Sequence, residues 1–228
     1  MTLCVYLPNW VGDAVQATPA IRALRRERVT AAALLTNDFE SAFAAFLSGV
    51  RERAGYERRG RGPFLTHRLV PPRERRRRGW RYRPIPALDY YLGIAAALGA
   101  ETGDRQLELA VEPAGEAQAA ALLAALPAGR RLAVLNNSGA FGPAKLWTDA
   151  GWVAVARRLH DEAGCNLLLL AGPAEAGQAR ALAAAITRPH LVTTAAAAPS
   201  LALSKSLVAA ADLLVSTDSG PRHFGPAF

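Results

Sequence analysis

The chain has 228 residues, 51% of them hydrophobic, which is the composition of a globular protein with a sizeable core. No run of about 18 apolar residues is present, so no membrane-spanning helix is expected. The first residues lack the basic and apolar regions of a signal peptide. Cys4 and Cys165 lie in apolar, strand-like segments and are expected to be buried free thiols in a reducing compartment.

The net charge is +8, and of the 27 basic residues only Lys145 and Lys205 are lysines. The positive charge is densest in "RERRRRGWRYR" at residues 73–83. Such a cluster attracts the phosphates of a nucleotide, a nucleic acid or an anionic lipid surface, and the alternative is a solvated arginine-rich loop. Nucleic acid is not an expected partner, because the only interleaved aromatics are Trp80 and Tyr82 and no binding motif is recognisable.

The first half of the chain predicts a strand, a helix, a second strand and a second helix before its pattern becomes irregular. The strand at 3–7 precedes a helix that contains Pro19 in its first turns or is capped at Thr18 and Pro19. A strand at 31–39 and a helix at 40–49, ended by Gly49, follow. Residues 51–88, rich in arginine, glycine and proline, are expected to be mostly irregular, and 88–100 form an amphipathic helix.

The second half alternates regularly between strands and helices. We place the boundary between the halves near 108–115, with a helix at 116–126 after it. The expected strands are 131–137, 165–172, 190–195 and 212–217, and the helices between them are 149–164, 175–186 and 200–211. This alternation predicts a parallel, doubly wound sheet, and the continuous apolar strands indicate burial on both faces.

Three polar clusters follow predicted strands directly. They are "NWVGD" after the first strand, "NNSGAFGPAK" after the strand at 131–137, and "STDSGPRH" after the last. Ligands of open parallel sheets bind beyond the carboxyl ends of the strands. These clusters are therefore the candidate binding loops.

The first cluster places Gly12 and Asp13 at a turn between strand and helix. Glycine permits tight backbone geometry and the close approach of a ligand. A carboxylate at this place can act as a general base toward a hydroxyl. The alternative is an N-cap, a position at which aspartate is favoured.

The second cluster offers Ser138, Gly139 and Lys145 to a phosphate. Backbone N–H groups of a glycine-containing loop can wrap a phosphate, and a lysine can neutralise a diphosphate leaving group. The loop lacks the P-loop pattern. The alternative for the lysine is a solvated surface position.

The third cluster, residues 217–223, offers hydroxyls, backbone amides and His223 to a phosphate or a sugar. The alternative is a helix start capped by Asp218 or Ser219. The nucleophile-elbow pattern G-x-S-x-G and the dinucleotide pattern G-x-G-x-x-G are both absent. No spacing of His, Cys, Asp and Glu indicates a metal site.

Together, the clusters resemble one family, the ADP-heptose–lipopolysaccharide heptosyltransferases, and in particular its heptosyltransferase II type. The resemblance is carried in order by "WVGDAVQATPAIRALRRE", "SGAFGPAKLW", "LLLLAGPAE" and "LVSTDSGPRHFGPAF". "TNDFESAFAAFLSG", "RAGYERRGRGPFLTHRL" and "LDYYLGIAAALGAE" resemble the N-terminal domain of that family. The resemblance thus covers most of the chain.

The resemblance implies a GT-B fold of two Rossmann-like, doubly wound α/β domains with parallel sheets. Residues 1–112 would form the acceptor-side domain and 113–228 the nucleotide-sugar domain. It further implies a general base and a diphosphate-binding lysine, which match Asp13 and Lys145. It also implies donor-site residues, which match Gly12, Ser138, Gly139, Thr217, Asp218, Ser219, Gly220 and His223, and a nucleoside contact, which matches Glu175.

The reaction implied by the resemblance is a metal-independent, inverting transfer of heptose from ADP-heptose to the inner core of lipopolysaccharide. No cofactor is implied beyond the donor substrate, and the expected location is the cytoplasm, with possible peripheral contact at the inner membrane surface. The basic run would meet phosphates of the core or lipid A there. The alternative is a sugar-nucleotide-binding or epimerase-like protein of the same fold, or an inactive remnant. Asp13 favours the enzyme, because a binding protein needs no base.

The chain departs from the family in two places. After residues 23–30 the family has further strand–helix units before the strand that 31–39 resemble, and these are missing here. The family also continues beyond the final "GPAF". Both domains are therefore expected to be incomplete, in an internally shortened and C-terminally truncated member.

Overall fold

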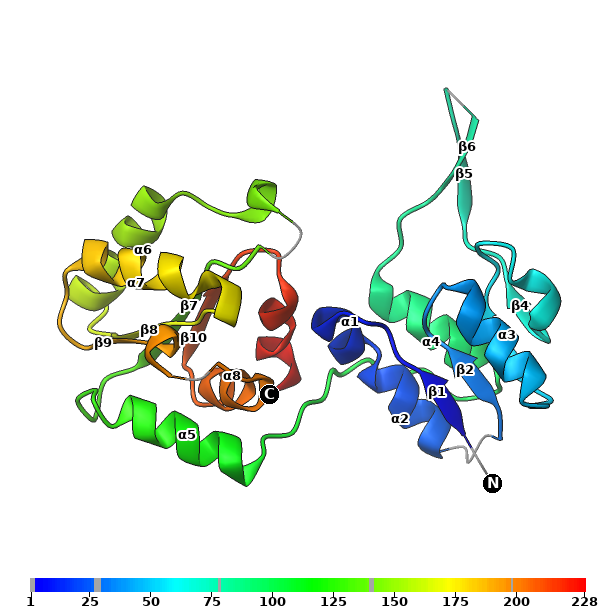
Figure 1. Ribbon diagram of the computed structural model, residues 1–228, viewed down its shortest axis with the longest axis horizontal. Coiled ribbons are helices and arrows are strands. Elements are labelled where there is room, and N and C mark those ends of the chain that lie inside the picture. Colours follow the sequence, from blue (N-terminus) through cyan, green and yellow to red (C-terminus); the bar gives the residue numbers. More distant parts are fainter. Residues whose placement is uncertain (1–2, 27–29, 78, 140–141, 198) are drawn as a thin grey trace. The chain divides into compact units, whose positions relative to one another are not determined.

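The computed structural model describes residues 3–26, 30–77, 79–139, 142–197 and 199–228. The chain forms two compact units, Met1–Glu108 and Leu109–Phe228. Each unit contains a four-stranded parallel sheet (Figure 1). No helix in the described ranges is both long enough and apolar enough to cross a membrane.

The sheet of the first unit pairs its strands in chain order, all parallel. The strands are β1 (Cys4–Tyr6), β2 (Ala32–Leu34), β3 (Arg53–Tyr56) and β4 (His67–Leu69). The helices are α1 (Val11–Gln16), α2 (Thr18–Arg26), α3 (Phe39–Leu47) and α4 (Ala87–Ala97), with a 3₁₀ turn η1 (Gly62–Phe64). A separate antiparallel hairpin, β5 (Arg73–Arg76) and β6 (Gly79–Tyr82), projects away from the sheet (Figure 1).

Alternate residues of β2 and its extension pack against different helices, because successive side chains of a strand point to opposite faces. Ala33 and Leu35 belong to the core formed with α2 and α4, whereas Ala32 and Leu34 pack against α3. All four side chains are at most 1% exposed. The continuous apolar run of this strand is therefore explained by helices on both faces of the sheet.

The positions of α2 and α3 have a topological consequence. The chain steps from β1 to β2 and from β2 to β3 in the same direction along the sheet. The first step passes over the face covered by α2 and the second over the face covered by α3. The two crossovers therefore have opposite hands, and one departs from the right-handed rule that nearly all such units obey.

The sheet of the second unit has the strand order β10-β7-β8-β9, all parallel. The strands are β7 (Leu132–Asn136), β8 (Asn166–Leu169), β9 (Leu191–Thr193) and β10 (Leu213–Ser216). The helices are α5 (Pro113–Leu123), α6 (Asp149–Asp161), α7 (Ala176–Ile186) and α8 (Leu201–Ala209). The 3₁₀ turns are η2 (Pro143–Lys145), η3 (Pro173–Glu175), η4 (Thr194–Ala196), η5 (Gly220–His223) and η6 (Gly225–Ala227). The predicted parallel sheet over residues 131–217 is confirmed.

Helices cover both faces of this second sheet. Trp152 of α6 and Leu182 of α7 join the strands in one core, and α5 and α8 lie on the other side (Figure 1). α5 and α8 approach closely at Gly115, where a Cβ would lie 2.7 Å from the carbonyl oxygen of Ala202. From β7 the chain adds β8 and β9 in one direction and then returns to place β10 on the other side of β7. This reversal makes the gap between β7 and β10 the switch point at which such sheets bind ligands.

Three predictions from the sequence are wrong. Residues 51–88 are not mostly irregular, because they form β3, β4 and the hairpin. The prediction took the arginines of this segment as a sign of a loop. Arg61 is instead fully buried, and it donates hydrogen bonds to the carbonyl oxygens of Tyr56 and Thr36. Cys4 is exposed rather than buried, since β1 is an edge strand among the described strands, whereas Cys165 is buried. The helix expected at 116–126 begins instead at Pro113, whose fixed φ suits a first helical position.

Candidate functional site

Asn136 ties together the two loops at the switch point of the second unit. It is the last residue of β7 and only 1% exposed. Its Nδ2 donates to Ser216 Oγ at 2.9 Å and to Ser219 Oγ at 2.8 Å. A buried amide that satisfies both of its N–H groups in this way holds the loop after β10 against the end of β7.

Thr217 and Ser138 connect the same two loops a second time. The Thr217 hydroxyl donates to the carbonyl oxygen of Ser138 at 2.6 Å. The Thr217 backbone N–H also donates to the Asn136 carbonyl oxygen at 3.1 Å, continuing the ladder between β10 and β7. Two polar clusters predicted to bind a ligand are therefore adjacent in the structure.

Glu175 brings a third loop, after β8, to the same place. Its Oε1 accepts hydrogen bonds from the Ser138 hydroxyl at 2.8 Å and from the Gly139 N–H at 3.2 Å. Its Oε2 accepts from the Gly172 N–H at 3.0 Å. The carboxylate thus occupies a cradle of one hydroxyl and backbone amides, which is the donor set that an anion takes at such loops.

Lys145 and Asp218 form an ion pair across the two loops. Lys145 Nζ lies 2.9 Å from Asp218 Oδ2 and 3.1 Å from the Asp218 carbonyl oxygen. Arg222 Nη1 lies 2.8 Å from Asp218 Oδ1, and Arg222 Nε donates to His223 Nε2. The hydrogen bond from Lys145, followed by the charge of Arg222, lowers the pKa of Asp218, which is therefore ionised at neutral pH. Arg222 was not singled out from the sequence, although it lies within the third cluster.

The helix-cap alternative for the third cluster is confirmed for the position of Ser219 but not for its side chain. Ser219 stands at the N-cap position of η5, which begins at Gly220, but its side chain makes no capping hydrogen bond. The Ser219 hydroxyl accepts from Asn136 instead, and the Asp218 carboxylate is used by Lys145 and Arg222. The side chains of Asp218 and Ser219 therefore bind neighbouring loop residues and do not cap the helix.

The loop after β7 turns at Gly142, whose φ of +123° is a conformation that L side chains rarely adopt. Its N–H donates to the Gly139 carbonyl oxygen at 2.8 Å. Ala140 and Phe141, in the middle of the predicted phosphate loop, lie outside the described residues. The turn delivers Lys145 to the Asp218 side of the loop.

In the first unit, Asp13 is the third residue of α1, one residue after the buried Gly12. The N-cap of α1 is Trp10, without a side-chain capping bond, so the N-cap alternative for Asp13 is wrong. Burial raises the pKa of Tyr91, and the charge of Asp13 raises it further. A carboxylate in the first turn of a helix faces the positive end of the helix dipole.

Within the described residues, no group of three or more His, Cys, Asp and Glu side chains is placed to hold a metal ion. The hydrogen-bond donors at the switch point are hydroxyls, backbone amides, Lys145 and Arg222, and they contact the carboxylates of Glu175 and Asp218. This is the chemistry of a site for a phosphate-bearing ligand with hydroxyl groups.

Comparison with known proteins gives a family and a fold. The family model described as glycosyltransferase family 9 (heptosyltransferase) matches residues 18–228. Escherichia coli ADP-heptose lipopolysaccharide heptosyltransferase II is 19% identical, with a TM-score of 0.74 over 100% of this chain and 82% of that one. The family 9 glycosyl transferase of Veillonella parvula is 17% identical, with a TM-score of 0.80 over 99% and 77%.

A third similar structure is E. coli heptosyltransferase WaaC with ADP, which is 17% identical, with a TM-score of 0.68 over 99% of this chain and 83% of that one. None of the curated protein sequences compared with the chain matches it. The structural likenesses confirm the predicted α/β fold with parallel sheets, of the GT-B-like type.

Proposed function

We propose a reaction for this chain, which belongs to glycosyltransferase family 9 (heptosyltransferase). The chain is a glycosyltransferase, and the proposed reaction is transfer of heptose from ADP-heptose to a sugar hydroxyl of the lipopolysaccharide inner core. The observation that carries the proposal is the convergence of three loops, holding Ser138, Glu175 and Asp218, at the switch point of the second sheet.

The second unit is proposed to hold the nucleotide sugar. Lys145 and Arg222 supply two positive charges within one loop cluster, and both contact the carboxylate of Asp218. A diphosphate carries more negative charge than one carboxylate and can accept bidentate hydrogen bonds from arginine, so it is a stronger partner for both cations. The hydroxyls of Ser138 and Thr217 and the N–H of Gly139 already donate within the same cluster, and phosphate or sugar oxygens would replace Glu175 and the Ser138 carbonyl oxygen as their acceptors.

The first unit is proposed to bind the acceptor, with Asp13 as the general base. In the reaction, the Asp13 carboxylate takes the proton of the acceptor hydroxyl while that oxygen forms a bond to the anomeric carbon of heptose. The bond from this carbon to the diphosphate breaks, and ADP leaves with the electron pair. Lys145 stabilises the charge that develops on the leaving phosphate. Attack from the face opposite the leaving group inverts the anomeric carbon, and no metal ion is required for these steps.

The hairpin of β5 and β6 is proposed to contact the phosphates of an anionic membrane surface. Cross-strand pairing sets Arg75 opposite Trp80 and Arg73 opposite Tyr82, so these four side chains share one face of the hairpin. Trp80 is 70% exposed and Tyr82 43% exposed. Arginine with interfacial aromatics is the combination that binds the headgroup region of a membrane.

The test is an assay of ADP release and product mass with purified protein, ADP-heptose and inner-core acceptors of graded length, with and without EDTA. Transfer of one heptose to one acceptor, undiminished by EDTA, is the expected result. ADP-glucose serves as the control donor. Binding of ADP-heptose with no transfer to any acceptor would replace this proposal by the sugar-nucleotide-binding alternative.

A further inference from the structure

The side chain of Asn137, the residue after β7, holds the far end of the loop that carries Lys145. Its Oδ1 accepts from the Trp147 N–H at 3.2 Å, and its Nδ2 donates to the Trp147 carbonyl oxygen at 3.4 Å. One planar amide thus contacts both backbone groups of a single residue. Lys145, the last residue of η2, stands two residues before Trp147, so these hydrogen bonds act on the segment that presents the lysine.

Asn136 and Asn137 direct their amides to two different loops, because successive side chains along a strand point to opposite sides. Asn136 is buried and holds the loop after β10. Asn137 is partly exposed and holds the loop after β7 at Trp147. Both loops are therefore attached to the end of the same strand, and the ion pair of Lys145 with Asp218 joins them a second time.

The ring of Trp147 fixes the same segment against α6. A Cβ at Gly151, in the first turn of α6, would lie 2.6 Å from Trp147 Cζ2, so only glycine lets the ring pack this closely. The Trp147 ring also meets the Trp152 ring edge to face, with ring centres 5.6 Å apart. Trp152 is buried in the core of the second unit. The position of Trp147 is therefore tied to this core as well as to Asn137.

Two further contacts hold the backbone around Lys145. Its N–H donates to the Gly142 carbonyl oxygen at 3.2 Å. The side chain of Leu146, the next residue, packs against Gly139, where a Cβ would lie 2.8 Å from Leu146 Cδ2. Neither contact uses the carboxylate of Asp218. The backbone of Lys145 can therefore stay in place when its Nζ leaves Asp218 for another anion.

A lysine whose backbone is fixed binds an anion at a lower entropic cost. Ordering a mobile loop costs backbone entropy in addition to the rotamer freedom of the lysine side chain. A backbone that is fixed before the ligand arrives leaves only the side chain to be ordered. A charge that is positioned in advance also stabilises the charge that develops on a leaving group without further rearrangement. The contacts around Trp147 give Lys145 both advantages.

We propose that Asn137 is a positioning residue of the donor site, which fixes the backbone at Trp147 so that Lys145 meets the diphosphate. The inference rests on the proposed function for the role of Lys145, whereas the hold of Asn137 on the loop rests on its two hydrogen bonds. Asn137 acts through Lys145 and takes no part in bond making. Removal of its amide should therefore weaken the binding of a diphosphate only while the lysine is present.

The experiment is a double-mutant cycle on ADP binding, measured by calorimetric titration of the whole chain. Asn137→Ala is expected to weaken ADP binding by about 3- to 10-fold, because the lysine keeps its charge but loses its fixed position. In the Lys145→Gln background, Asn137→Ala should change the affinity by less than about 2-fold. The loss in Asn137→Ala should also shrink at high salt, because it is a loss of contact between a cation and phosphate.

Asn166→Ala is the matched control. Asn166 is the first residue of β8, and its Nδ2 donates to the Pro127 carbonyl oxygen at 2.9 Å. The control removes an asparagine amide from the opposite end of the same sheet, so it should lower the melting temperature and leave ADP binding unchanged. A second variant, Trp147→Leu, keeps the backbone groups that bind Asn137 but removes the ring that packs on α6. Its effect on ADP binding should depend on Lys145 in the same way.

The outcomes separate this inference from the proposed reaction. An equal effect of Asn137→Ala with and without Lys145, or an equal loss of ADP affinity in Asn166→Ala, would overturn the positioning role. Weaker ADP binding in Lys145→Gln with parental binding in Asn137→Ala would overturn it too, but would leave the donor site standing. Parental binding in Lys145→Gln would overturn both. Coupled losses of ADP binding without heptose transfer by the parent would uphold the positioning role and refute the reaction.

Discussion

Lys145 and Asp218 face each other across the switch point, with Nζ 2.9 Å from Oδ2, although they are separated by most of the second unit in sequence. The side chains are 38% and 59% exposed. An exposed pair of this kind contributes about 0–1 kcal/mol to stability. The contact therefore adds little to stability, and under the proposed function it holds Lys145 at the donor site.

Lys145→Gln is predicted to lower the affinity for ADP by about 10- to 100-fold, because one cation–phosphate interaction is lost. Asp218→Asn should instead raise the affinity for ADP, since it removes the carboxylate that competes with the phosphates for Lys145. Calorimetric titration at low and high salt measures both. Lys205→Gln, at the other lysine of the chain, is the control and should leave ADP binding unchanged. Equal ADP affinity in all four proteins would remove Lys145 from the site.

Asn136→Leu is predicted to destabilise the protein by about 1–3 kcal/mol, because the hydroxyls of Ser216 and Ser219 lose their shared donor. Donor affinity should fall with it, since the loop after β10 is no longer held. Denaturant unfolding of Asn136→Leu, Ser219→Ala and the double variant gives the coupling between them. Strictly additive effects would show that the hydrogen bond does not hold the loop.

The sheet of the second unit was predictable because its strands are long apolar runs separated by amphipathic helices. The convergence of Ser138, Asp218 and Lys145 followed from the same pattern, because parallel strands end at one edge. The contact between Asn136 and the two serines was not predictable, since strand order cannot be read from one sequence. Glu175 was found only through the resemblance.

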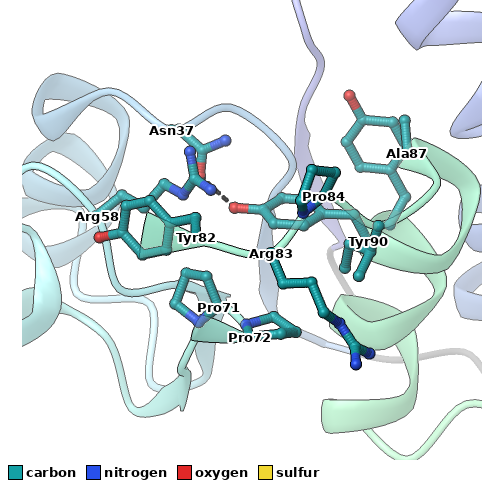
Figure 2. Close-up of a pocket in the computed structure, with 11 residues that line it drawn as sticks. Asn37, Arg58, Pro71, Pro72, Tyr82, Arg83, Pro84, Ala87 and Tyr90 are labelled. Carbon is teal, nitrogen blue, oxygen red and sulfur yellow. Dashed lines mark hydrogen bonds between the residues drawn. The ribbon is translucent and has the colours of Figure 1, made fainter. Parts of the chain in front are cut away.

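The first unit was harder to predict because its charged residues do not behave as surface residues. Arg61 is buried and donates hydrogen bonds to carbonyl oxygens, and Arg58 stacks on the ring of Tyr82. Thr36, which accepts from Arg61, and Tyr82, on which Arg58 stacks, lie far from these arginines in sequence. A hydropathy pattern cannot show such contacts, so the segment was predicted to be a loop. A cavity of about 380 Å³ lined by Arg58 was missed for the same reason: its walls come from a loop, a hairpin and a helix (Figure 2).

Stability should fall in acid partly because of Asp38, the N-cap of α3, whose side chain accepts from the Ser41 N–H at 2.7 Å. Burial raises the pKa of this carboxyl, but hydrogen bonds from Thr36 and Ser41 outweigh it and bring the value down to about 2. A carboxyl with a lowered folded pKa stabilises above its unfolded pKa, and this contribution is lost as pH falls from about 4 to about 2. Thermal unfolding of the parent should show this loss, whereas Asp38→Asn, which keeps a capping oxygen, should show a smaller one. Parallel curves for the two proteins would assign the acid sensitivity to other carboxyls.

The hairpin is predicted to bind anionic vesicles through the face that carries Arg75 and Trp80. Arg75→Glu should weaken binding to vesicles that contain phosphatidylglycerol, and the difference from the parent should shrink at high salt. Trp80→Ala should weaken binding at all salt concentrations, because the indole contributes apolar contact. Arg51→Glu, the same charge change away from the hairpin, is the control. Sedimentation of equal amounts of parent and Arg75→Glu with vesicles at low salt would leave the hairpin without a membrane role.

Asp13→Asn tests the proposed base, and the structure sharpens the test. Because Asp13 is the third residue of α1 rather than its N-cap, the asparagine variant cannot be rescued by capping. If the carboxylate serves only the helix dipole, the variant loses about 0.3–1 kcal/mol of stability and keeps its turnover. If it is the general base, kcat should fall by about 10²–10⁴-fold with the affinity for ADP-heptose unchanged.

Asp149→Asn is the matched control, because Asp149 is likewise an acid in the first turn of a helix, α6, and has no proposed part in the reaction. Thermal melts of both variants measure the dipole contribution, and single-turnover kinetics measure the chemical step. A similar small loss of stability in both variants, with loss of turnover in Asp13→Asn alone, is the expected result. Near-parental turnover in Asp13→Asn would mean that another group accepts the proton, and Asp13 would then be a structural acid of α1.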